Sequence, residues 1–109
     1  MPLTKDFKDT IKARADSDPE FRIGLFKEAI EALLSDDLET GKVLLRDYVN
    51  ATVGFETLAA EMDKDPKSLM RMLGPKGNPR ADNLLGMVAR LKQREGVSLA
   101  ISRSNGLHA

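Results

Sequence analysis

The stretch 55–79 constrains the fold most, because its apolar spacing is helical while proline and glycine keep each helix short. FETLAAEMD has the spacing of a first helix, which breaks at DKD. PKSLMRML has that of a second helix, in which Asp65 is a typical N-cap and Pro66 suits the first turn. Gly74 suits a left-handed C-terminus, and Pro75 prevents the helix from continuing. We therefore expect two short helices joined by a turn of about three residues.

These two short helices match the geometry of helix-turn-helix DNA-binding units. In such a unit a small residue is needed where the first helix meets the second, and Ala59 occupies that position. Apolar side chains of both helices must then point inward, and we expect this of Leu58, Met62, Leu69 and Met72. The same arrangement also occurs as a plain packing unit, so the spacing alone leaves both interpretations open.

The outer face of the second helix keeps side chains that suit DNA binding. Arg71 can donate a pair of hydrogen bonds to guanine, Ser68 can bond to a base or a phosphate, and Lys67 can meet a phosphate. Met70 is a candidate contact to a thymine methyl group or to a protein partner. Free backbone N–H groups at 78–81 are expected to hold a phosphate. The predicted DNA-binding residues are Lys64, Lys67, Ser68, Met70, Arg71, Lys76, Asn78 and Arg80.

Helical periodicity on both sides of this unit predicts an all-α fold of about five helices. Apolar residues recur every four positions in LTKDFKDTIKARA, from Leu3 onward, and they cover more than one side of FRIGLFKEAIEALL. We expect Asn78 and Pro79 to cap a last helix that ends at Gly96. The apolar stripe of that helix consists of Leu84, Leu85, Val88 and Leu91. The tail VSLAIS alternates weakly, which favours a short C-terminal β-strand.

Charge divides the chain into two halves, although its 17 basic and 17 acidic side chains cancel overall. Residues 1–40 hold six basic and ten acidic side chains, whereas residues 41–109 hold eleven basic and seven acidic ones. Such an asymmetry indicates that one half meets a polyanion, although a random split of so few charges explains it equally well. We expect one compact unit with three parts: N-terminal helices for packing or partner binding (1–36), a helix-turn-helix domain (37–97) and a tail (98–109).

Residue types that catalysis and metal binding depend on are scarce. The chain has no Cys, and its one His, His108, lies beside the C-terminus, so we expect no catalytic residue, metal site or cofactor and no enzyme. The acidic run at 36–39 lacks the spacing of a calcium loop, and the glycines at 74–78 lack the order of a phosphate loop. Neither a signal peptide nor an apolar run of about 20 residues is present, which predicts a cytoplasmic protein without membrane contact.

Three short motifs lie between Leu44 and Val97: Leu58-Ala59 in the first short helix, Ser68-Leu69 in the second, and the loop GPKGNP. In this segment, and most specifically in YVNATVGFETLAAEMDKDPKSLMRMLGPKGNP, the chain resembles the addiction-module antidote proteins, HigA-like antitoxins with a lambda-repressor-type (XRE-like) helix-turn-helix. The turn departs from the family pattern, which has Gly at the position of Asp63 and an apolar residue at that of Lys64. We therefore expect this turn to have a different local geometry.

The resemblance implies a transcriptional repressor of its own operon that also neutralises a RelE/HigB-like toxin, a ribosome-dependent mRNA interferase. It further implies a homodimer, because two recognition helices must reach successive major grooves of operator DNA about 34 Å apart. The tail strand is a candidate for pairing across the twofold axis. By the same analogy, the acidic residues 1–40 would face the basic toxin. Two alternatives remain: a protein–protein interaction module in which the helix-turn-helix is only a scaffold, and a stand-alone regulator without a toxin.

Overall fold

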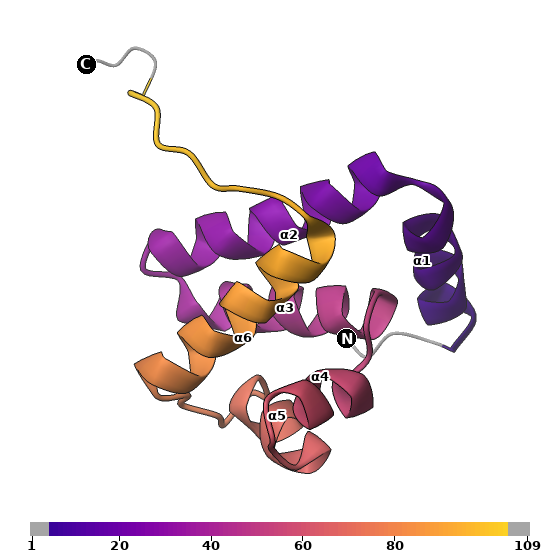
Figure 1. Ribbon diagram of the computed structural model, residues 1–109, viewed down its shortest axis with the longest axis vertical. Helices are drawn as coiled ribbons and strands as arrows, with labels where there is room; N and C mark the ends of the chain where they lie inside the picture. Colours follow the sequence, from indigo (N-terminus) through magenta and orange to yellow (C-terminus); the bar gives the residue numbers. More distant parts are fainter. Residues whose placement is uncertain (1–4, 105–109) are drawn as a thin grey trace.

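The computed structural model describes residues 5–104, and within this range the chain forms six α-helices and no strand (Figure 1). In chain order the helices are α1 (Lys5–Ser17), α2 (Pro19–Leu34), α3 (Leu38–Ala51), α4 (Phe55–Glu61), α5 (Pro66–Met72) and α6 (Ala81–Glu95). The predicted all-α class is confirmed. Six helices are present where about five were expected, because that count took the two short helices of the stretch 55–79 as a single unit. Leu3 and His108 lie outside the described residues.

The predicted C-terminal strand is wrong. Residues 97–104 follow α6 without regular structure and run away from the body of the molecule (Figure 1). No strand elsewhere in residues 5–104 lies beside them to pair with their backbone N–H and C=O groups, and an isolated strand is not stable in water. The weak alternation in VSLAIS therefore does not lead to a strand within one copy of the chain.

Helices α2 and α3 form an antiparallel pair, and α1 packs against both of them (Figure 1). Asp18 is the N-cap of α2, and its carboxylate accepts hydrogen bonds of 3.1 and 3.3 Å from the N–H groups of Glu20 and Phe21. Gly41 lets the two helices approach closely, since a Cβ atom at this position would lie 2.4 Å from Cδ2 of Leu33. Side chains of both helices enter the apolar core that α4, α5 and α6 share.

A single apolar core contains side chains from each of the helices α2, α3, α4, α5 and α6. Leu58 and Leu69 are fully buried in it, while Met62 and Met72 are partly buried and pack against it, so the inward orientation predicted for these four side chains is confirmed. Leu85 was expected in the apolar stripe of α6 but is 64% exposed. Met87 takes its place in the core, because positions 84, 87, 88 and 91 share one face of the helix.

Candidate nucleic-acid interface

The turn between α4 and α5 begins with a close reversal of the backbone at Asp63. The N–H groups of Asp63 and Lys64 donate hydrogen bonds of 3.2 and 2.8 Å to the carbonyls of Ala60 and Ala59. These are the two bonds of a Schellman motif, in which the first residue beyond the cap is left-handed. Asp63 has φ of 56°, so it adopts the conformation for which glycine is the usual residue. Contrary to our expectation of a different local geometry, the aspartate retains a glycine-type backbone here.

Helix α5 has one buried face and one exposed face. Its N-cap Asp65 accepts a hydrogen bond of 3.4 Å from the N–H of Lys67, as the sequence predicted for this position. Leu69 is completely buried in the core. On the other side, Lys67 and Arg71 are exposed, Met70 is 42% exposed and Ser68 is partly buried. The residues proposed for the groove of DNA therefore lie on the accessible face of α5, with Ser68 at its margin.

The loop after α5 is held by Lys42, a residue of α3 that was not predicted as functional. Its ammonium group donates hydrogen bonds of 3.0 Å to the carbonyl of Gly74 and 2.7 Å to that of Gly77. Lys42 is 1% exposed, and its Nζ lies 3.2 Å from Oε2 of Glu39 at the surface. The sequence does contain a signal for this role: Lys42 precedes the buried Leu45 by three positions and so lies on the buried face of α3.

Gly77 brings the loop directly against the end of α5. A Cβ atom at this position would lie 2.1 Å from the carbonyl oxygen of Arg71 and 2.5 Å from that of Met72, which no side chain can satisfy without a backbone shift. Together with the hydrogen bonds from Lys42, this close contact fixes the loop against the helix. Arg71 and Lys76 consequently line one shallow depression of about 480 Å³, together with Gly74, Pro75 and Gly77.

The start of α6 differs from the prediction. Arg80, rather than Asn78, is the N-cap residue, and no side chain accepts a hydrogen bond from the first turn at the cap position. Asn78 is exposed two positions earlier, because Pro79 keeps the backbone before the helix extended. The guanidinium of Arg80 lies 3.2 Å from the carboxylate of Asp82, and both side chains are exposed. In the first turn the N–H of Asn83 donates a hydrogen bond of 2.8 Å to the carboxylate of Asp82, which leaves the N–H groups of the exposed Ala81 and Asp82 for a phosphate contact.

Four basic side chains without an ion pair lie in and around α5. Within residues 5–104, no carboxylate forms an ion pair with Lys64, Lys67, Arg71 or Lys76, all of which are exposed. The acids of the same turn, Asp63 and Asp65, are exposed too, so the basic surface is not continuous. The eight predicted DNA-binding residues all lie between the turn before α5 and the start of α6, on the side of the molecule away from α2 (Figure 1).

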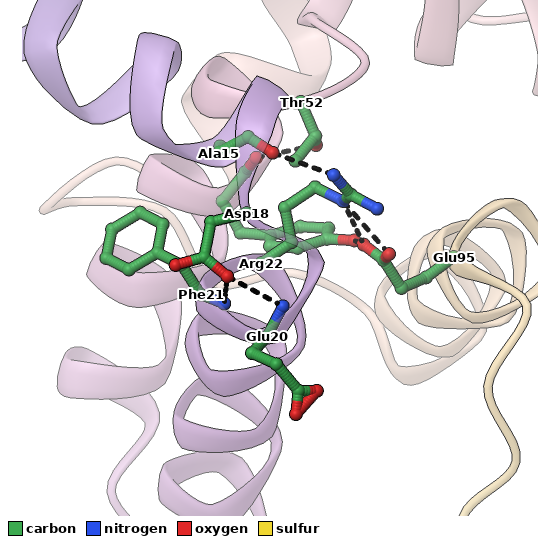
Figure 2. A network of polar contacts seen from close by, with 8 residues as sticks. Ala15, Asp18, Glu20, Phe21, Arg22, Thr52 and Glu95 are labelled. Atoms are coloured by element: carbon green, nitrogen blue, oxygen red, sulfur yellow. Dashed lines mark hydrogen bonds and ion pairs between the residues drawn. The ribbon is translucent and has the colours of Figure 1, made fainter.

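A second polar network fixes the other end of α6. Arg22 of α2 donates to the carboxylate of Glu95 at 3.0 Å and to the carbonyl of Ala15 at 2.7 Å, as Figure 2 shows. The hydroxyl of Tyr48 donates a hydrogen bond to the same carboxylate, whose side chain is 5% exposed. Burial, and then this hydrogen bond, raise the pKa of Tyr48 well above its ordinary value. These contacts hold the last turn of α6 against α2 and α3.

Within the part of the chain that the structure describes, no three His, Cys, Asp or Glu side chains come together as a metal site would require. None of the helices in residues 5–104 combines the length and apolar character needed to traverse a membrane. Comparisons of the chain with protein-family models, curated proteins and solved structures found no match.

Proposed function

We propose that the chain is a sequence-specific DNA-binding transcriptional repressor that uses α5 as its recognition helix. One observation carries this proposal: Lys67, Met70 and Arg71 of α5 are exposed to solvent, while Leu69 buries the other face of the helix in the core. The two cations, Lys67 and Arg71, form no ion pair within residues 5–104. A helix held in this way can enter the major groove without rearrangement of the fold.

The chemistry of this surface divides between reading and positioning. Arg71 has the planar pair of donors that matches O6 and N7 of guanine, and Met70 offers an apolar contact to a thymine methyl group. Lys67 and Lys76 contribute charge that meets phosphates and sets the register on the duplex. The uncapped start of α6, with Arg80 beside it, adds backbone N–H donors for a further phosphate.

The proposal includes a homodimer, because a single α5 reads too few base pairs for tight operator binding. It also places this homodimer in the cytoplasm. Two copies related by a twofold axis would place their recognition helices in successive major grooves about 34 Å apart. The resemblance to HigA-like antitoxins adds a second activity, the neutralisation of a RelE/HigB-like toxin. The DNA-binding part stands on the geometry of α5, and the antitoxin part on the resemblance.

Binding of the full chain to the DNA upstream of its own gene tests the proposal. The titration compares this DNA with a scrambled duplex of the same composition, over a range of salt concentrations. We expect at least about a 1,000-fold preference for the promoter at moderate salt, the lower end for specific regulators. The logarithm of the affinity should fall with the logarithm of the salt concentration by about 0.9 for each phosphate contact. Equal affinity for the two duplexes would refute the proposal.

A further inference from the structure

A groove of about 710 Å³ runs between α2 and α3, apart from the surface around α5. Its floor is apolar: Phe21, Leu25 and Leu44 line it and are each only partly buried. These side chains lie at the margin of the core rather than inside it, so they expose apolar area that a partner would cover. The lining of α2 extends from residue 20 to residue 32, which corresponds to about 18 Å of helix.

The rim of the groove is acidic. Glu20, Glu28 and Glu31 line it and are exposed, whereas Lys27 is the one basic residue among the lining side chains. Within residues 5–104 no cation forms an ion pair with any of these three glutamates. At the Phe21 end, the guanidinium of Arg14 lies 4.6 Å from the centre of the aromatic ring. With three glutamates against Lys27, the net charge of the rim is therefore negative.

Gly24 leaves the middle of the groove open. It is a helix-interior glycine, although glycine is less favourable there than almost any other residue. An added Cβ atom would meet no atom within 4 Å, so no internal contact requires the missing side chain. The missing side chain leaves room for another backbone to approach α2 closely.

We infer that the α2/α3 groove binds a basic amphipathic helix of a protein partner. Apolar side chains of this helix would fill the space above Phe21, Leu25 and Leu44, and Lys or Arg side chains on its flanks would meet the acidic rim. This is the helix-in-groove mode of recognition, with anchors spaced at three and four residues. The inference rests on the antitoxin part of the proposed function, to which it adds the docking surface and the kind of toxin segment that it takes.

Two synthetic peptides of about 14 residues, long enough to span the groove, provide the first test. Both carry Leu along one helical face; one has Arg at the flanking positions and the other has Glu. Binding to the full chain is measured by fluorescence anisotropy, and the contact surface by changes in backbone amide shifts. We expect the Arg peptide to bind at least tenfold more tightly than the Glu peptide and to shift amides of α2 and α3. Equal binding of both peptides, or shifts confined to other helices, would overturn the inference.

Variants at Gly24 separate binding from stability. Gln is a better helix former than Gly and meets no atom here, so Gly24→Gln should melt at or above the wild-type temperature and yet bind the Arg peptide at least tenfold more weakly. Gly24→Ala, which fills much less of the groove, is the graded control. Wild-type affinity in the Gly24→Gln variant would contradict the inference.

Charge variants and DNA binding complete the design. The double variant Glu28→Gln/Glu31→Gln should lose the preference for the Arg peptide, whereas Glu56→Gln on α4 should keep it. Sedimentation equilibrium tests whether a second copy occupies the groove instead: a dimer that Gly24→Gln dissociates would overturn the inference. Promoter binding is measured on the wild type and on the same variants. A wild type that binds the promoter but not the Arg peptide would count against the groove alone, and one that binds the peptide but shows no promoter preference would count against the repressor proposal alone.

Discussion

Replacing Lys42 with Met removes the ammonium group but keeps an unbranched apolar side chain in the core. The carbonyls of Gly74 and Gly77 then lose hydrogen bonds of 3.0 and 2.7 Å. A hydrogen bond to a charged group contributes about 1.5–3 kcal/mol, so the two together contribute about 3–6 kcal/mol. Removing the ammonium also relieves the penalty of burying a charge, which offsets several kcal/mol of this loss. We expect a net loss of about 2 kcal/mol in the free energy of unfolding.

Urea-induced unfolding followed by circular dichroism measures this change directly. For a domain of this size, a loss of about 2 kcal/mol lowers Tm by about 8–16 °C. The matched control is Lys27→Met, an exposed lysine of α2, which should change the free energy of unfolding by less than about 0.5 kcal/mol. If Lys42→Met unfolds at the same urea concentration as the wild type, the hydrogen bonds of Lys42 do not hold the loop, and the reasoning is refuted.

Three further changes probe the backbone and the Glu95 network. Asp63→Gly should raise the free energy of unfolding by about 1 kcal/mol in urea titrations, because it relieves the left-handed strain. The matched change Asp82→Gly, in the first turn of α6, has no such strain to relieve and should lower the free energy of unfolding by about 0.3–0.5 kcal/mol. Gly77→Ala should lower the thermal midpoint and reduce the free energy of unfolding by about 1–3 kcal/mol, since its Cβ atom would lie 2.1 Å from the carbonyl oxygen of Arg71. An unchanged midpoint would show that the loop can shift without cost. Tyr48 is the one tyrosine of the chain, and its pKa is raised on folding, so the stability it contributes is complete below about pH 10 and decreases as the pH rises beyond that value. The stability difference between the wild type and Tyr48→Phe should therefore shrink above pH 10, and a difference that stays constant would contradict this. In a separate ultraviolet titration, Glu95→Gln should lower the pKa of Tyr48, because it removes the carboxylate that accepts the hydrogen bond from the hydroxyl.

Local signals predicted the short helices around the proposed DNA surface well. Pro66 and Asp65 mark the start of α5, and the spacing of Leu58 and Leu69 identifies the buried faces of both helices, because each feature depends only on neighbours in the chain. The all-α class follows from the same periodicity.

Features that depend on distant residues could not be predicted in this way. The hydrogen bonds of Lys42 join residues 32 and 35 positions apart, and the contact of Arg22 with Glu95 spans 73 positions. Periodicity identifies a face of a helix but not which edge of that face is covered, so Leu85 was placed inside although it is exposed. The groove between α2 and α3 arises from the packing of two helices, and neither sequence shows it alone.

The central claim is that α5 reads base sequence, and the promoter preference of Arg71→Ala tests it most directly. The measured quantity is the ratio of the affinities for promoter and scrambled DNA at one salt concentration, for the wild type and the variant. If Arg71 reads a base, its loss should reduce this ratio by about 1–3 kcal/mol, or roughly 5- to 150-fold, while Lys76→Ala weakens binding to both duplexes alike. A ratio that is unchanged in Arg71→Ala would contradict the claim for the one α5 side chain that has paired donors for guanine, and would remove Arg71 from the residues proposed to read bases.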